Sequence, residues 1–340
     1  MKTYAPLAVI GLVIVGALGF LLFRGSTDQP QDRDIINVDS TNVGTVSASE
    51  PSAELRAQFD DVDFAQSLID YDKVFSGGPP RDGIPALTDP NFDALNTATI
   101  PGESLGIFIQ HDGEKRFYPY TVLVWHEIVN DSIGDLEFAA TFCPLCGSAI
   151  VFDRNVNGEL KEFGVSGFLF ESNMIMYDRT DTPSLWSQAR AEAVIGDQAG
   201  TQLEILDFQL LTLDDVRNLH PDSAILSEDT GFSRNYGFDP YSGYEDNDDT
   251  IFPVTVDDTR HSAKEVFFIV PQAERSVAIQ IGNVERGESA DNSDLGLSVE
   301  KTSDGEVIVT NSEGETQPGY YEMWFSWAQH HQDDGDVWSI

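Results

Sequence analysis

Both cysteines of this 340-residue chain lie in one pentad, Cys143-Pro144-Leu145-Cys146-Gly147. Two thiols three positions apart can bind one metal ion, form a disulfide, or exchange electrons between these states. Because the chain has no other cysteine, its thiol chemistry is confined to this pair. Three alternatives stay open at this stage: a metal site, a redox-active dithiol, and a structural disulfide or inert pair.

The segments around the pentad predict a strand, a tight turn and a second strand. Residues 136–142 and 148–152 are mostly apolar, and Gly147 permits a left-handed backbone after the second cysteine. This pattern is typical of a metal knuckle, whereas the second cysteine of a thioredoxin-type site lies in a helix. A closed zinc site needs four ligands, and two thiolates alone or with a thioether suit copper. Copper and zinc are both candidates.

Further ligands have to come from outside the cysteine pair. His126 begins a His-Glu-x-x sequence whose fifth position is Asn130 instead of a second histidine, so the sequence does not predict a metalloprotease. His126 either completes a metal site or packs in the core with a hydrogen bond. Met174 and Met176 stand two apart, so on a strand they face the same side and offer thioethers, or they fill the core. No catalytic residue is assigned.

The charge of the chain is extreme, with 58 acidic and 19 basic side chains and a net charge of −39. Such a surface repels phosphates, so nucleic acid is excluded as a partner. In concentrated salt, the repulsion between acidic side chains is screened within a few ångströms, so a chain of this charge can stay folded. The composition therefore predicts a halophilic protein with an acidic surface. An apolar content of 41% predicts a folded body.

The amino terminus predicts a membrane anchor. Residues 5–23 are an uninterrupted apolar run, long enough to cross a bilayer as a helix. No small-x-small cleavage site follows, so we expect residues 1–24 to be an uncleaved anchor, with a cleaved signal as the alternative. Residues 25–55 read as a flexible acidic linker, and residues 56–340 as the globular domain. We expect a single-pass protein of the cell membrane whose domain is extracellular.

The remaining pattern predicts a mainly β fold with short helices, of the α+β class. Residues 105–118 favour a hairpin around Asp112-Gly113, and a short helix is expected within residues 120–129. Strands at 265–270, 277–281 and 305–310 repeat the order of the earlier ones, which suggests two related β-rich halves packed as one globular body.

Several short motifs together point to a known family. They are residues 77–86, 125–131, 141–147, 163–167, 172–179, 184–188 and 323–328. With this set, the chain resembles the family called domain of unknown function 3179, over residues 70–330. The resemblance implies no activity, because the family is uncharacterised. One departure is His330-His331-Gln332, where the resemblance implies Phe-His-Pro.

Three functions are compatible with these observations. The first is an extracytoplasmic protein that binds a soft transition metal, copper or zinc, at Cys143 and Cys146, completed by His126, Met174 or Met176. The second is a thiol-disulfide oxidoreductase that uses the same cysteines with a redox partner. The third is a non-catalytic surface module that binds a small ligand. The sequence predicts no oligomeric state.

Overall fold

The computed structural model describes residues 49–273, 275–332 and 334–340. The predicted membrane span and most of the predicted linker lie outside these residues. Within the described part of the chain, every helix is too short or too polar to cross a bilayer. Strands occupy 39% and helices 13%, which confirms the predicted β-rich α+β class.

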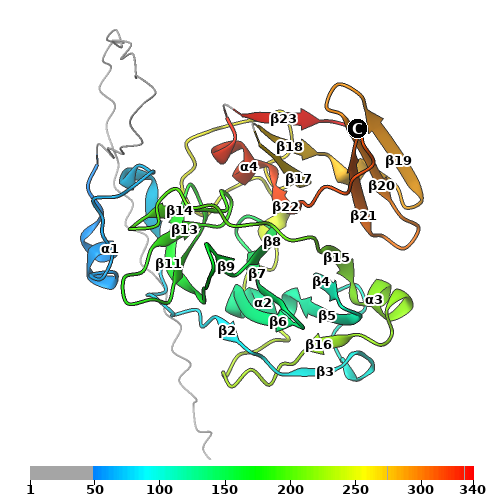
Figure 1. Ribbon diagram of the computed structural model, residues 1–340, viewed down its shortest axis with the longest axis horizontal. Coiled ribbons are helices and arrows are strands. Elements are labelled where there is room, and N and C mark those ends of the chain that lie inside the picture. Colours follow the sequence, from blue (N-terminus) through cyan, green and yellow to red (C-terminus); the bar gives the residue numbers. More distant parts are fainter. Residues whose placement is uncertain (1–48, 274, 333) are drawn as a thin grey trace, which may run out of the picture. The chain divides into compact units, whose positions relative to one another are not determined.

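An eight-stranded sheet runs through the centre of the fold (Figure 1). In spatial order its strands are β2 (Leu87–Thr88), β6 (Ile128–Ile133), β7 (Leu136–Cys143), β8 (Ser148–Asp153), β22 (Tyr320–Met323), β17 (Val266–Gln272), β18 (Arg275–Ile279) and β23 (Gly335–Trp338). The early and late parts of the chain meet between β8 and β22, where Tyr321 pairs with Ala149. The cysteine pentad connects β7 to β8 and therefore lies beside this junction.

The other strands form four smaller sheets in the described residues. One contains β1 (Val74–Ser76), β11 (Phe163–Phe170), β12 (Asn173–Asp178), β13 (Leu185–Ser187) and β14 (Glu192–Ile195). Another contains β15 (Gln209–Thr212), β4 (Leu105–His111), β5 (Glu114–Pro119), β16 (Ala224–Leu226) and β3 (Phe92–Ala94). The last two are β9 (Asn155–Val156) with β10 (Glu159–Leu160), and β19 (Glu288–Asn292) with β20 (Leu297–Lys301) and β21 (Val307–Asn311).

The described helices are short. They are α1 (Ala53–Gln58), α2 (Tyr120–His126), α3 (Leu213–Leu219) and α4 (Trp324–His330), with 3₁₀ turns at Tyr71–Lys73, Leu95–Thr97, Tyr244–Asp246 and Ile281–Asn283. Both α2 and α4 directly follow a strand and end in a histidine, His126 and His330. These two helix ends bring imidazoles to two separate places in the fold.

The local predictions around β4 and α2 are confirmed, with one difference in length. The β4–β5 hairpin turns at Asp112 and Gly113, which both have positive φ. Helix α2 ends at His126 and β6 begins at Ile128, because Glu127 between them takes a left-handed φ of 58°. The predicted helical region of 120–129 is therefore split between a helix and a strand.

The two similar strand pairs lie in different sheets, and the later strands do not form one sheet of their own. Strands β17 and β18 do form a hairpin, as β4 and β5 do. However, β17 and β18 share the central sheet with β6–β8, whereas β21 belongs to a separate three-stranded sheet. All described residues nevertheless belong to one compact unit.

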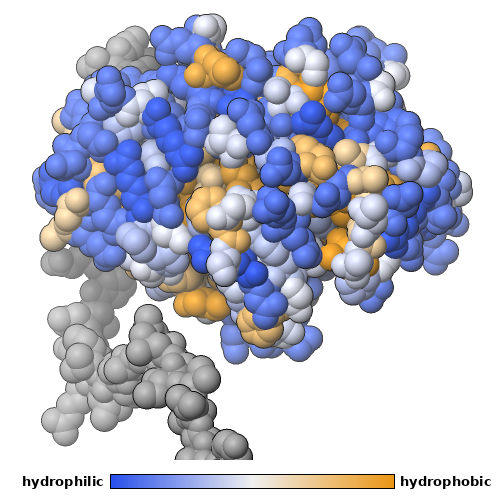
Figure 2. Space-filling view, turned by 90° about the horizontal axis from the view of Figure 1, so that it is seen from below, coloured by the Kyte–Doolittle hydropathy of each residue, from blue (hydrophilic) through white to orange (hydrophobic). Residues whose placement is uncertain are grey.

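The interior of the protein is apolar and its surface is mostly hydrophilic, as the composition predicts. The largest apolar cluster contains both cysteines and side chains from early and late parts of the chain, including Trp186 on β13 and Trp324 on α4. On the face seen in Figure 2, hydrophilic residues cover most of the surface and hydrophobic ones form small separate areas. The acidic side chains are thus largely solvated, while the thiols lie inside.

Candidate functional site at the paired cysteines

The pentad forms the predicted turn between two strands. Cys143 ends β7 and pairs with Ser148 at the start of β8. The N–H of Cys146 donates to the carbonyl of Cys143 at 3.2 Å, which closes the turn. Gly147 has a φ of 55°, the left-handed conformation that its lack of a Cβ permits. The pentad therefore has the geometry of a knuckle, and its turn conformation follows from the local sequence.

Both thiols are reduced and buried. Cys143 is 2% exposed and Cys146 is fully buried, and the two cysteines lie 3.3 Å apart. The Cys146 thiol donates to the carbonyl of Ser172 at 3.0 Å. Burial raises the pKa of Cys146 well above its usual range, and the neighbouring Cys143 raises it further. Cys146 is therefore a protonated thiol at neutral pH until something replaces its proton.

A thioether from the far end of the chain packs against this turn. A Cβ built on Gly147 would lie 2.9 Å from Cγ and 3.4 Å from Sδ of Met323. The N–H of Met323 also donates to the carbonyl of Cys146 at 2.9 Å. Strand β22 thus brings a third sulfur beside the pentad. The sequence analysis missed Met323, because the spacing between it and the cysteines carries no local signal.

The residue before Met323 is a buried carboxyl group. Glu322 is fully buried, and its Oε1 accepts from Ser326 at 2.6 Å and from Asn173 at 3.3 Å. Its Oε2 has no hydrogen-bond partner among the described residues. Burial raises the pKa of Glu322 to about 8. A neutral carboxylic acid therefore lies close to Cys146 on the other side of the sheet junction.

A buried polar network supports the turn from the side of β13. The Ser148 hydroxyl donates to Oε1 of Gln188 at 2.6 Å, and Nε2 of Gln188 donates to the Thr141 hydroxyl at 2.8 Å. Asn173 joins this network by donating from Nδ2 to the Ser148 hydroxyl at 3.3 Å, and its Oδ1 accepts from the N–H of Ala189 at 3.1 Å. These bonds fix both strands that flank the pentad, so the thiols are held in a rigid setting.

Comparison with known proteins identifies the family. Residues 81–317 match the family described as "Protein of unknown function (DUF3179)". The chain belongs to the DUF3179 family. The match contains the pentad and His126, whereas β22 and α4 lie beyond its end. No curated protein and no solved structure matches this DUF3179 chain.

In this DUF3179 protein, His126 uses both ring nitrogens within the fold. Its Nδ1 lies 2.7 Å from the carbonyl oxygen of Pro85 and must donate to it. Its Nε2 is then an acceptor, and the Tyr236 hydroxyl donates to it at 2.8 Å. Burial lowers the pKa of His126, so the ring stays neutral. This geometry agrees with a hydrogen-bonded packing role.

Met174 and Met176 lie in the same apolar core as the cysteines. They are almost fully buried, and both point to one face of β12, as their spacing predicts. Met174 pairs with Leu169 across the strands, and Met176 pairs with Val165 and Trp186. Their surroundings are those of core residues on an inner strand.

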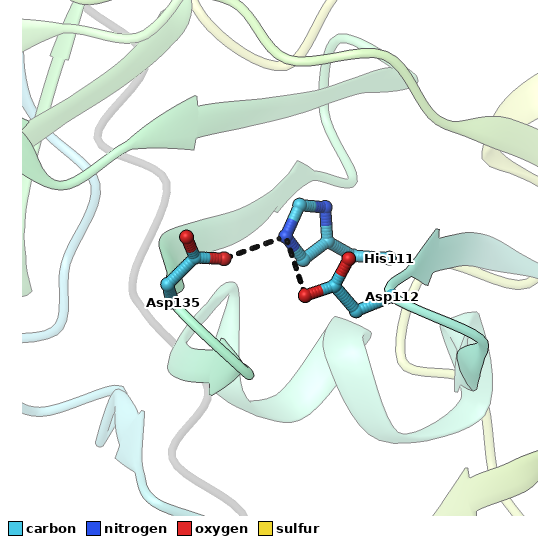
Figure 3. Close-up of side chains that lie close together, drawn as sticks. All are labelled: His111, Asp112 and Asp135. Carbon is cyan, nitrogen blue, oxygen red and sulfur yellow. Dashed lines mark hydrogen bonds and ion pairs between the residues drawn. The ribbon is translucent and has the colours of Figure 1, made fainter.

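One other cluster has the composition of a metal site. A metal site needs at least three histidine, cysteine or carboxylate side chains whose ligand atoms lie close together. Within the described residues, one such group has its ligand atoms within 4.8 Å of one another, and it consists of His111, Asp112 and Asp135. Figure 3 shows both carboxylates directed at Nε2 of His111, with Asp135 Oδ1 at 2.9 Å and Asp112 Oδ2 at 3.9 Å. Both aspartates are largely exposed, so a solvated ion pair accounts for the cluster.

Replacing Gly147 with alanine is expected to destabilise the protein by about 1–3 kcal/mol. The new Cβ faces both a left-handed backbone and the Met323 side chain at 2.9 Å. Gly158→Ala is the matched control, because Gly158 also has a positive φ but no atom within 4 Å of the added carbon. Urea unfolding should show the larger loss for Gly147→Ala. Equal losses would mean that Met323 does not press on the turn.

Proposed function

We propose that this DUF3179 protein binds one soft transition metal ion, Cu(I), through Cys143 and Cys146, with Met323 as a third sulfur donor. The observation that carries the proposal is that a thioether packs on the same buried turn that holds both thiols. Two sulfurs come from the pentad, and the third packs on Gly147 from β22. Soft thiolate and thioether ligands are those that Cu(I) prefers.

The donor set supports copper over zinc. A structural zinc site needs four ligands from cysteine, histidine or carboxylate side chains. In the described part of the chain, no third ligand atom of this kind lies within 4.8 Å of both sulfurs. His126, a sequence candidate for such a ligand, already hydrogen-bonds through both nitrogens. A sulfur-only set of low coordination number remains, and this favours Cu(I).

The buried setting suits a metal that has to be shielded. The turn is enclosed by the apolar core, which limits the access of water and oxidants to the sulfurs. Thiols bind metals as thiolates, so uptake of the ion has to release the Cys146 proton. We also propose that residues 5–23 anchor the protein in the cell membrane with its globular domain outside, on the basis of the apolar run alone.

The proposal is tested by anaerobic Cu(I) titration of the reduced, full-length protein against a chromophoric copper chelator. We expect binding of about one ion per chain and an X-ray absorption spectrum in which sulfur atoms alone are bonded to the copper. A nitrogen shell, or tighter binding of Zn²⁺ than of Cu(I), would contradict the assignment.

The thioether assignment has its own variant and control. Met323→Leu keeps the volume of the side chain but removes the sulfur, so the affinity for Cu(I) should fall by about tenfold, equivalent to about 1.4 kcal/mol. Met174→Leu makes the same change in the same core and should leave the affinity unchanged. If Met174→Leu weakens binding and Met323→Leu does not, the third ligand has been placed on the wrong strand.

The close approach of the two cysteines also supports a second candidate, a dithiol that cycles with a disulfide. Closing 3.3 Å to a sulfur-sulfur bond of about 2.05 Å needs only a small movement. The raised pKa of Cys146 opposes this function, because the thiolate is the reactive species. A reduction potential well above about −300 mV would favour the redox function.

A further inference from the structure

A hollow of about 340 Å³ is lined mainly by two segments, residues 86–91, which include β2, and residues 229–232. Its volume is within the range of small-molecule sites. Arg179 and Glu162 complete its wall, and Phe232, which is 46% exposed, supplies an aromatic face. None of these side chains belongs to the proposed copper site.

A series of hydrogen bonds leads from this hollow to His126. Thr230 is partly exposed and lines the hollow, and its hydroxyl lies 2.5 Å from the hydroxyl of Tyr236. The Tyr236 hydroxyl lies 2.8 Å from Nε2 of His126. On the far side of the ring, Nδ1 of His126 lies 2.7 Å from the carbonyl oxygen of Pro85. A hydroxyl at the hollow is therefore connected to a buried imidazole without a gap.

The buried end of this series fixes the direction of every proton in it. A carbonyl oxygen only accepts, so His126 carries its proton on Nδ1 and accepts at Nε2. The one proton of Tyr236 must then go to His126, so the Tyr236 oxygen accepts from Thr230. The Thr230 oxygen itself accepts from the N–H of Phe232 at 3.3 Å. Its second lone pair has no partner among the described residues, and an oxygen in this state can act as a nucleophile.

The three side chains have the order of a nucleophile, a relay and a base. Burial lowers the pKa of His126, so the ring is neutral and its Nε2 can take up a proton. When Thr230 gives its proton to Tyr236, Tyr236 passes its own proton to His126 and stays neutral. The carbonyl of Pro85 fixes the tautomer of the base, as the carboxylate does in a Ser-His-Asp triad.

Arg179 supplies hydrogen-bond donors on the wall of the same hollow. Its guanidinium group has five N–H groups, of which three bond to Tyr177, Glu162 and Asp82. In the part of the chain that the structure describes, the other two have no partner. Two carboxylates hold this cation in place, so it can donate to an oxyanion that forms in the hollow.

The rest of the wall indicates the class of substrate. Among the described residues that line the hollow, Asp89, Glu162 and Asp229 are acidic and Arg179 is basic. These carboxylates disfavour a substrate with a negative charge, whereas the exposed ring of Phe232 can pack against an apolar group. A hollow of this size and character fits a small, uncharged molecule.

We propose that this hollow is an active site in which Thr230 attacks the carbonyl carbon of a small, uncharged carboxylic ester. The Thr230 oxygen bonds to that carbon while the Thr230 proton passes to Tyr236 and the Tyr236 proton to His126. The carbon–oxygen bond of the ester breaks, and the alcohol leaves with a proton returned along the same series. Water then hydrolyses the acyl-Thr230 ester and releases the acid. Arg179 stabilises the oxyanion in both steps. The reaction uses no cysteine and is independent of the copper proposal.

The test is the hydrolysis of p-nitrophenyl acetate and p-nitrophenyl butyrate by the full-length protein in concentrated salt, together with labelling by a fluorophosphonate probe. We expect saturable release of p-nitrophenol from at least one ester. The probe loses fluoride as its phosphorus bonds to the nucleophile, so mass spectrometry should locate one adduct on Thr230. Absence of an adduct on Thr230, or hydrolysis of neither ester, would overturn the proposal.

Two variants interrupt the series at different points. Thr230→Val keeps the shape of the side chain without the hydroxyl, and Tyr236→Phe keeps the ring but removes the relay. Both should lower kcat by about 100-fold or more with little change in KM, because a positioned proton transfer contributes at least that factor. A side chain that only supports the fold would not produce this separation of kcat from KM.

Two further variants complete the test. Thr230→Ser restores a hydroxyl and should keep both hydrolysis and labelling, which shows that position 230 tolerates substitution. Thr97→Ala removes an exposed hydroxyl outside the hollow and should have the kcat of the wild type. If Thr230→Val is as active as Thr230→Ser, or if folded Tyr236→Phe keeps the kcat of the wild type, the proposed series does not carry the reaction.

Discussion

Replacing Cys143 with serine is expected to abolish the retention of Cu(I) by the reduced protein. Serine has nearly the same shape, but its hydroxyl is a hard donor that stays protonated at neutral pH, so the ion loses one of its two thiolates. The expected change is from about one copper ion per chain to almost none after desalting, measured by elemental analysis.

A second variant separates the sulfur site from the alternative that includes His126. His126→Gln should retain copper, because both nitrogens of His126 already hydrogen-bond to Pro85 and Tyr236. If His126→Gln loses copper while its thermal unfolding temperature is unchanged, His126 is a ligand of the copper ion. Copper retained by Cys143→Ser would rule out the pentad as the binding site.

The stability of the metal-free protein is expected to fall as the pH rises from about 5 to about 8, in part because of Glu127. Burial raises the pKa of this carboxyl group from 4.5 to about 8. The folded state therefore holds the proton more tightly than the unfolded state does. The stability that this proton contributes is fully present below the pKa of Glu127 in the unfolded state. It is lost as the pH rises through the pKa of Glu127 in the folded state. At about 1.4 kcal/mol per pKa unit, it amounts to several kcal/mol.

The measurement is urea unfolding at several pH values, for wild type and Glu127→Gln. Glutamine is a neutral mimic of the protonated acid, so the variant should show a flatter dependence between pH 5 and 8. Glu137→Gln on β7 is the comparison at a more exposed position, 30% exposed and paired with Arg154. If wild type and Glu127→Gln share the same slope, Glu127 is ionised inside the folded protein.

The parts of this fold that depend on local chemistry could be predicted from the sequence. Asp112-Gly113 and Asn157-Gly158 supply the positive φ that hairpin turns need, and both hairpins are present. The pentad turn is local in the same way, because Gly147 and the flanking apolar runs determine it.

The parts that depend on sheet order could not be predicted. Met323 and Glu322 reach the pentad because β22 pairs with β8, and no pattern within either strand specifies that partner. His126 is a similar case, since its partner Tyr236 lies 110 positions later in the chain. The sequence identified the thiols but not the side chains that surround them, because contacts between distant segments follow from tertiary packing.

Helix α4 begins directly beside the cysteine turn. Met323 is the N-cap residue of α4 beside the cysteine turn, and His330 ends the helix about 10 Å further on at 1.5 Å per residue. Ser326, one turn into the helix, bonds back to Glu322. Met323 thus belongs both to the proposed copper site and to the start of α4, so a ligand bond to its sulfur would also restrain the first turn of this helix.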